Sequence, residues 1–280
     1  MTHSLHGTTT LANGVKMPWL GLGVFKVEEG AELVDAIRAA VRFGYRSIDT
    51  AAIYGNEASV GEGIRQALKD NGLSREDLFV TSKAWNSDLG YESTLAAYET
   101  SLAKLGLEYL DLYLIHWPVA GKYKEAWRAL EKLYNDGRVR AIGVSNFHVH
   151  HLKDLMGGAE IKPMVDQVEF HPLLAQRELL AYTREQGIQF EAWSPLMQGE
   201  LLNDPTLQAI ADRHGKSVAQ VILRWDLQHG VVTIPKSTKE ARIIENGSLF
   251  DFELTQAEMG EIDAMNRDRR VGPDPDNFDF

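Results

Sequence analysis

The chain has 280 residues, of which 44% are hydrophobic, and it carries a formal net charge of −11. This length allows one large domain with a sizeable core, and barrels commonly reach it as a single domain. The acidic balance argues against a broad nucleic-acid surface, and no run of 18 apolar residues is present to span a membrane. The absence of cysteine excludes disulfides, thiol catalysis and cysteine metal sites. No secretion signal is visible, so we expect a cytoplasmic protein.

The first residues are expected to form a hairpin. Residues 8–17 resemble two short strands around Asn13-Gly14, the pair that a type I′ turn requires. Residues 18–24 follow as a short strand, and residues 29–43 carry apolar side chains at helical spacing. We expect the hairpin to precede a barrel and to cap one of its ends.

Helices and strands then alternate to the end of the chain. Further strands are expected at 45–50, 78–82, 110–115, 139–144, 164–168, 188–193 and 231–234. Further helices are expected at 57–70, 93–105, 124–135, 150–156, 175–185, 206–214, 218–228, 239–246 and 255–265, before an irregular tail at 272–280. This alternation predicts right-handed βαβ units and a parallel sheet.

An open doubly wound sheet would show the same alternation. Its dinucleotide-binding form should carry Gly-x-Gly-x-x-Gly after the first strand, and Gly21-Leu-Gly23-Val-Phe-Lys26 lacks the third glycine. The sequence therefore predicts an α/β fold, a (β/α)₈ TIM barrel forming a single domain over 1–280. The N-terminal β-hairpin would cap one end, and accessory helices would lie near the C-terminus.

Polar residues lie at or just after the ends of three expected strands: Asp49, Tyr54, Lys83 and His116. The steps from Asp49 to Lys83 and from Lys83 to His116 are 34 and 33 residues. One strand–helix unit of a barrel takes roughly 30 residues. Each residue alone would more often be a cap, a packing residue or a solvated charge. The shared spacing instead predicts that all four meet at the carboxyl end of the barrel.

This set can protonate a carbonyl oxygen. Tyr54 would be the general acid, and the Lys83 ammonium beside it is expected to lower its pKa from about 10. Asp49 would pair with Lys83, whose burial would otherwise be costly. His116 would donate a hydrogen bond that orients the carbonyl and stabilises the alkoxide. The set supplies no electrons, so a hydride donor must lie alongside.

Later strand ends offer groups for such a donor. A carboxamide such as that of nicotinamide suits Ser145, Asn146 and Gln167, while Trp193 offers a flat face for the ring. A local basic pocket suited to phosphate consists of Lys236, Ser237, Lys239 and Arg242.

Taken together, these motifs resemble those of the aldo-keto reductase family. They are Gly21-Leu-Gly-Val-Phe25, Asp49-Thr-Ala-Ala-Ile-Tyr54-Gly-Asn-Glu57, Ser82-Lys83-Ala-Trp85-Asn86, Leu112-Tyr-Leu-Ile-His116-Trp-Pro118, Gly143-Val-Ser-Asn-Phe147, Gln167-Val-Glu-Phe-His-Pro172 and Ile234-Pro-Lys-Ser237. Within the family, the chain is most similar to bacterial glyoxal or methylglyoxal reductases and 2,5-diketo-gluconate reductases. The resemblance implies a barrel that binds NADPH and transfers its hydride to an aldehyde or ketone.

The resemblance also assigns residues to roles. It implies a catalytic tetrad of Asp49, Tyr54, Lys83 and His116. It implies that NADPH or NADP+ is held by Gly23, Val24, Phe25, Asp49, Ser145, Asn146, Gln167, Trp193, Ser194, Leu196, Lys236, Ser237, Arg242, Glu245 and Asn246. It implies substrate contacts from Phe25, Tyr54, Trp85, His116 and Trp117.

Two short segments bear on the substrate. In this family the loop after His116 and the C-terminal tail wall the pocket, and both are short here. We therefore expect an open pocket for small activated carbonyls rather than steroids. Glyoxal, methylglyoxal, other α-oxo-aldehydes, aromatic aldehydes and keto-sugars are the expected substrates, and a monomer is expected.

Three histidines look like a metal cluster: His148, His150 and His151. They should begin a helix on which their side chains splay apart, so we expect no metal site. The run Arg267–Arg270 is expected to be solvated. Two other functions stay open: a barrel isomerase or aldolase with Lys83 as a Schiff-base lysine, and a cofactor-binding sensor or partner subunit without turnover.

Overall fold

The computed structural model describes residues 4–280, and its main sheet has eight parallel strands. They are β3 (Leu22–Gly23), β4 (Ser47–Asp49), β5 (Phe79–Ala84), β6 (Leu110–Ile115), β7 (Val139–Ser145), β8 (Val165–Glu169), β9 (Gln189–Trp193) and β10 (Val232–Thr233). Each strand pairs with the next along the chain. Parallel bridges from Leu20 to Thr233 and from Gly23 to Lys236 join the first strand to the last. The predicted barrel is confirmed.

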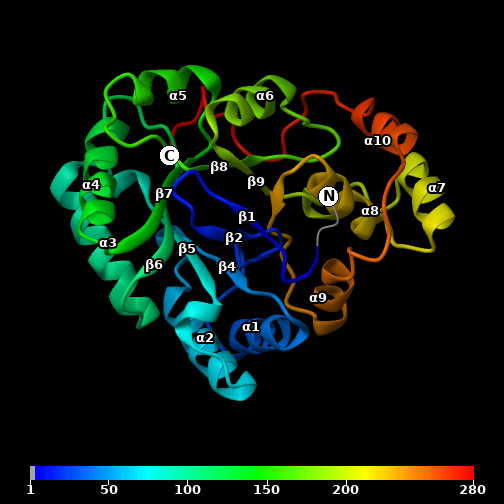
Figure 1. The fold of residues 1–280 in the computed structure, drawn as a ribbon, viewed down its shortest axis with the longest axis horizontal. Coiled ribbons are helices and arrows are strands. Elements are labelled where there is room, and N and C mark those ends of the chain that lie inside the picture. Colours follow the sequence, from blue (N-terminus) through cyan, green and yellow to red (C-terminus); the bar gives the residue numbers. More distant parts are fainter. Residues whose placement is uncertain (1–3) are drawn as a thin grey trace.

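Ten α-helices of the described residues surround this sheet (Figure 1). They are α1 (Ala31–Phe43), α2 (Glu57–Asn71), α3 (Tyr91–Leu105), α4 (Tyr123–Asn135), α5 (Val149–Met156), α6 (Arg177–Gln186), α7 (Pro205–His214), α8 (Val218–Gln228), α9 (Glu240–Gly247) and α10 (Gln256–Asp263). Every expected helix is present, with each end within two residues of its expected position. None of the helices in residues 4–280 is both long enough and apolar enough to cross a membrane.

Local capping chemistry explains where several helices begin. The Asp204 carboxylate accepts from the N–H groups of Thr206 and Leu207 and so starts α7. Ser217 and Thr255 form capping boxes that start α8 and α10. A helix interior shows as apolar periodicity, but its first residue is set by such a cap, so periodicity alone misplaced some ends.

The N-terminal hairpin consists of β1 (Thr8–Thr10) and β2 (Lys16–Pro18), paired antiparallel. Thr9 Oγ1 donates to Gln189 Oε1 at 2.9 Å, at the first residue of β9. Asn13 Nδ2 donates to the Arg140 carbonyl at 2.9 Å, near the start of β7. The hairpin therefore caps the amino-terminal end of the barrel, as predicted, and the opposite end is left for chemistry.

The strands β5, β6 and β8 are buried along their whole length. Such continuous burial is usual where a parallel sheet is covered on both faces. Polar side chains that point inward at the carboxyl ends of these strands are therefore held by a rigid, closely packed wall.

Candidate active site

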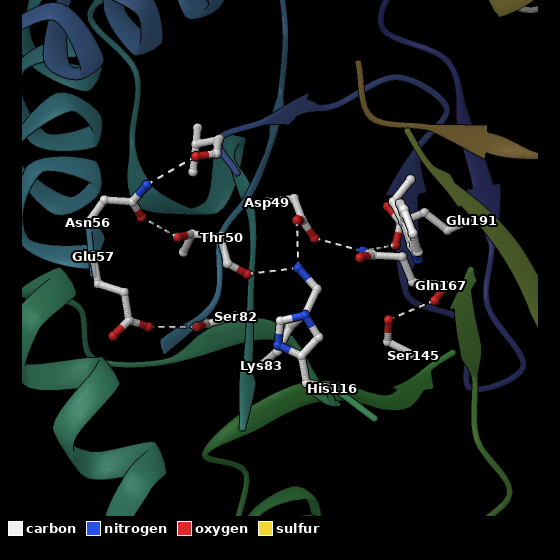
Figure 2. A network of polar contacts seen from close by, with 12 residues as sticks. Asp49, Thr50, Asn56, Glu57, Ser82, Lys83, His116, Ser145, Gln167 and Glu191 are labelled. Carbon is white, nitrogen blue, oxygen red and sulfur yellow. Dashed lines mark hydrogen bonds and ion pairs between the residues drawn. The ribbon is translucent and has the colours of Figure 1, made fainter. Parts of the chain in front are cut away.

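Lys83 and Asp49 form a buried ion pair at the carboxyl ends of β5 and β4. Lys83 Nζ donates to Asp49 Oδ1 at 2.6 Å and to the Thr50 carbonyl at 2.9 Å (Figure 2). The Lys83 side chain is 0% exposed and that of Asp49 is 3% exposed. A lone ammonium there would be strongly disfavoured, so each partner requires the other.

Tyr54 ends the short helical turn η1 (Ala52–Tyr54), and its ring centre lies 5.2 Å from Lys83 Nζ. Gly55 follows with φ of 64°, a left-handed conformation that favours glycine and turns the chain into α2. Lys83 acts to lower the pKa of Tyr54, as expected, but it does not decide the net direction. Burial raises that pKa above 10.0 and outweighs the opposing Lys83 charge. The phenol therefore stays protonated, which is the form that can give up a proton.

The loop that carries Tyr54 is fixed by Asn56. Thr50 Oγ1 donates to Asn56 Oδ1 at 2.8 Å. Asn56 Nδ2 donates to the carbonyls of Val24 and Val27 at 3.1 and 2.9 Å. These bonds join the loop after β4 to the segment that carries Phe25, whose ring centre lies 5.0 Å from that of Tyr54.

His116 follows β6 as a neutral imidazole. Burial, with the Lys83 charge adding to it, holds the pKa of His116 well below 6.5. Nδ1 is buried and has no hydrogen-bond partner among the described residues. Because orphaned buried N–H groups are rarer than orphaned acceptors, we assign the proton to Nε2. The ring meets Tyr54 edge-on at 5.8 Å, so His116 can offer one N–H beside the phenol.

Gln167 continues the polar network from Asp49 to Glu191. Its Nε2 donates to Asp49 Oδ2 at 2.7 Å and to Glu191 Oε2 at 2.9 Å (Figure 2). Burial, and then the Asp49 charge, raise the pKa of Glu191 to about 8. Both hydrogens of the Gln167 side-chain amide are thus donated within the protein. Its side-chain oxygen, Oε1, is left to accept a hydrogen bond from a ligand.

The expected carboxamide-binding residues divide into two groups. The Asn146 amide is fully engaged, because Nδ2 donates to the His116 carbonyl at 3.0 Å and Oδ1 accepts from Trp193 Nε1 at 2.9 Å. Asn146 therefore holds the indole in place. Ser145 Oγ donates to the backbone carbonyl of Gln167 at 2.7 Å and accepts from Asn146 Nδ2 at 3.2 Å, which leaves it one lone pair for a further donor. The Gln167 amide oxygen and the Ser145 hydroxyl are acceptors that fit a carboxamide NH₂, so the residues present fit nicotinamide.

The expected basic pocket lies between β10 and α9. Lys236 pairs with Gly23, where a Cβ would lie 2.8 Å from the Ile234 carbonyl, so only glycine permits this approach. Lys239 Nζ is engaged by Glu32 Oε1 at 2.9 Å. Lys236 and Arg242 are exposed, and neither has an ion-pair partner within residues 4–280. These two cations fit phosphate groups.

The other expected cofactor residues lie around the same end of the barrel. After β3 come Val24 and Phe25, after β9 come Ser194 and Leu196, and after β10 and along α9 come Ser237, Glu245 and Asn246. The structure thus brings the cofactor set to the end that carries the tetrad.

The expectation of an open pocket needs correction, because the tail folds back over its expected lining. The Phe280 ring stacks on Trp85 with centres 5.7 Å apart and meets Trp117 edge-on at 5.2 Å. The Phe278 ring lies 5.2 Å from Trp117. Asn86 Nδ2 donates to the Phe280 carbonyl at 3.1 Å. A short tail can therefore still cover the expected pocket, because its last residues include two phenylalanines.

The expectation that three histidines splay apart is also wrong. Ring nitrogens of His148, His150 and His151 converge with the Asp276 carboxylate, all within 4.8 Å of one another. Asp276 comes from the tail and supplies the charge that draws the imidazoles together. Of the expected solvated run, Arg269 binds Glu200 at 2.5 Å and Arg270 Nη2 lies 2.9 Å from His148 Nε2.

The sequence did not predict four residues that belong to this site: Glu191, Thr50, Phe278 and Phe280. Glu191 had a detectable signal, because it is two residues before Trp193 on the same strand and must share its face. Thr50 acts through its carbonyl, which any residue would supply. The two phenylalanines lie in an irregular segment whose course no periodicity predicts.

Comparisons with known proteins show which sequences and structures this chain resembles. The model of the Aldo/keto reductase family matches residues 19–267. Two Bacillus subtilis (strain 168) proteins, an uncharacterized oxidoreductase YtbE and a glyoxal reductase, are 71% and 66% identical to the chain over the whole length of both sequences. The crystal structure of a Bombyx mori aldo-keto reductase in complex with NADP matches with a TM-score of 0.91 and 36% identity. That match covers 99% of this chain and 97% of the other.

Proposed function

Because the chain belongs to the aldo/keto reductase family, we propose that it uses NADPH to reduce small aldehydes and ketones to alcohols, with Tyr54 as the general acid. Glyoxal, methylglyoxal and other α-oxo-aldehydes are the favoured substrates, followed by aromatic aldehydes and keto-sugars. The buried Lys83–Asp49 ion pair, with Lys83 Nζ beside the Tyr54 ring and that ring beside His116, carries this proposal.

The residues divide the chemistry between them. NADPH supplies the hydride when it is bound, and Gln167, Ser145, Lys236 and Arg242 are suited to hold it. His116 donates from Nε2 to the carbonyl oxygen of the substrate and so stabilises negative charge as it develops there. Tyr54 gives its phenolic proton to the same oxygen. Lys83, held by Asp49, stabilises the phenolate left on Tyr54.

The geometry of Lys83 argues against an aldolase. A Schiff-base lysine must present a neutral amine to a carbonyl. Lys83 Nζ is instead fully buried and bonded to a carboxylate and a carbonyl, and despite burial the Asp49 charge leaves its pKa raised. It therefore remains charged and engaged.

The test is NADPH consumption by the purified protein, with methylglyoxal, an aromatic aldehyde, a keto-sugar and a steroid ketone assayed in parallel. Tyr54→Phe keeps the ring that packs on Phe25 and removes the proton. It should lower kcat by roughly 10²- to 10⁴-fold while NADPH still quenches tryptophan fluorescence.

The matched control is Tyr182→Phe, whose hydroxyl makes no hydrogen bond within residues 4–280, and it should leave kcat unchanged. Reduction that persists in Tyr54→Phe would remove Tyr54 as the acid. A steroid ketone turned over much faster than methylglyoxal would contradict the substrate class. NADPH binding without consumption of any kind would favour a sensor.

A further inference from the structure

The tail (residues 271–280) forms no helix or strand, yet it is anchored at both ends. The N–H groups of Val271 and Gly272 donate to the two carboxylate oxygens of the buried Glu169 at 2.6 and 3.0 Å. A Cβ on Gly272 would lie 2.4 Å from the Trp193 ring, so glycine is needed where the tail passes that indole. Phe280 is held at the other end by Trp85 and Asn86.

Asp276 anchors the middle of the tail to the start of α5. Its Oδ2 lies 2.8 Å from His148 Nδ1. Its Oδ1 lies 2.9 Å from His150 Nε2 and 3.5 Å from His151 Nε2. Figure 1 shows the red C-terminal segment running beside α5. Residues far apart in the chain thus meet in one cluster, the Asp276–histidine cluster (His148, His150, His151 and Asp276).

The contacts on the far side of each ring locate its proton. Arg270 Nη2 can only donate, so His148 Nε2 accepts from it and the proton lies on Nδ1, facing Asp276. The His148 backbone N–H donates to His151 Nδ1 at 3.1 Å, so the proton of neutral His151 lies on Nε2. Burial, with the His150 charge adding to it, lowers the pKa of His151 to about 4, which keeps this ring neutral. His150 Nε2 donates as well, because an ionised carboxylate only accepts.

These proton positions argue against a metal ion in the cluster. An imidazole binds a metal through a nitrogen lone pair, and its other nitrogen then carries the proton. In His148 and His151 that proton would face the Arg270 guanidinium and a backbone N–H, both donors. His150 and Asp276 alone are fewer than the three or four protein ligands of a zinc site. The cluster is better described as three donors around one carboxylate.

We propose that the Asp276–histidine cluster is a latch that positions the tail, and that it thereby sets how well the site holds an aromatic aldehyde relative to a small one. This specificity role rests on the proposed reductase function. Asp276 is a positioning residue, because it acts through the phenylalanines that follow it and does not touch the reacting atoms.

A continuous series of rings connects the latch to the chemistry. Phe278 and Phe280 lie 5.3 Å apart, and Phe280 stacks on Trp85. The Trp85 ring meets His116 edge-on at 5.2 Å. A substrate ring bound to His116 through its carbonyl would therefore lie among these aromatic side chains. Methylglyoxal has no ring to place among them.

The test compares Asp276→Ala with Asp279→Ala. Asp279 is an acidic residue on the same tail, but its side chain makes no hydrogen bond or ion pair within the described residues. Amide hydrogen exchange over 273–280 should be at least tenfold faster in Asp276→Ala alone. The KM for an aromatic aldehyde should rise about two- to tenfold, the size of a lost aromatic contact, with kcat unchanged. For methylglyoxal both constants should stay within about twofold. His150→Ala, which removes one donor, should change exchange and KM in the same direction by less.

Unchanged exchange in Asp276→Ala would overturn the latch. An equal KM rise for both aldehydes would overturn its role in specificity. If the wild type binds zinc stoichiometrically and Asp276→Ala does not, the assigned proton positions are wrong and the cluster is a metal site. If no aldehyde is reduced, the proposed function fails, while hydrogen exchange still decides whether the latch exists.

Discussion

Lys236 and Lys239 precede α9 at a separation of three residues, and their surroundings give them different roles. Lys239 is paired with Glu32 at 2.9 Å, whereas Lys236 is beside Gly23, forms no ion pair among the described residues and acts on Glu32 only as a weaker, more distant charge. The chain carries a net charge of −11, so a free cation is where a cofactor phosphate can bind without first displacing a carboxylate. The same residue type thus serves structure at one position and recognition at the other.

Lys236→Ala should weaken NADPH binding by about tenfold or more, because a charge-assisted contact to the 2′-phosphate is lost. NADH lacks that phosphate, and its Kd should change by less than about twofold. Fluorescence titration with both cofactors measures this, and Lys239→Ala serves as the matched control. Equal weakening of NADPH and NADH would remove Lys236 from the 2′-phosphate.

At the scale of elements, the turn between β4 and α2 is tied to its neighbours through buried polar side chains. Asn56 fastens it to the segment after β3, and Ser82 Oγ donates to Glu57 Oε1 at 2.6 Å to fasten it to β5 (Figure 2). Tyr54, the proposed acid, lies directly before these two anchors in the chain. A loop can therefore carry a precisely placed phenol because strands hold it on both sides.

Asn56→Ala should lower the free energy of unfolding by about 2–3 kcal/mol, because two buried carbonyls and the Thr50 hydroxyl lose their partner. The freed turn should also lower kcat, since Tyr54 no longer has one position. Urea unfolding and steady-state kinetics measure the two effects. The control is Asn71→Ala at the end of α2, where one bond to the Ala67 carbonyl is lost, so kcat should not change. If the free energy of unfolding falls while kcat stays the same, Asn56 stabilises the fold but does not position Tyr54.

At the scale of the whole molecule, several buried carboxyl groups have raised pKa values, because burial favours their protonated form. Burial raises the pKa of Glu191 to about 8, and it raises those of Asp166 and Asp226 well above 3.8. An unfolded carboxyl releases its proton near pH 4. Above that pH the folded chain keeps protons that the unfolded chain has lost, so the free energy of unfolding falls as pH rises.

Glu191→Gln should remove one part of this dependence. For Glu191 the loss of stability runs from about pH 4.5 to about pH 8 and is on the order of 5 kcal/mol. The variant should therefore gain stability relative to the wild type between pH 5 and pH 8.5, as measured by urea unfolding at each pH. Exposed Glu178→Gln should show no such gain. If the difference in free energy of unfolding between the variant and the wild type is the same at pH 5 and at pH 8.5, the pKa of Glu191 is not raised by folding.

Sequence alone determined the barrel and the strand ends at which Asp49, Lys83 and His116 lie, because both follow from local repetition. Alternating helices and strands leave few topologies, and steps of 34 and 33 residues return Lys83 and His116 to the level of Asp49. The Asn13-Gly14 pair located the hairpin, although only Gly14 of the two has a positive φ, so the turn is not the expected type I′.

Tertiary structure decided what depends on distance through space. The pKa of Tyr54 is raised because burial outweighs Lys83, and the extent of burial is not written in neighbouring residues. Asp276 lies more than 120 residues from the histidines it joins, in a tail without periodicity. Short-range patterns encode elements and their order, whereas desolvation and the path of an irregular segment arise only once the chain is packed.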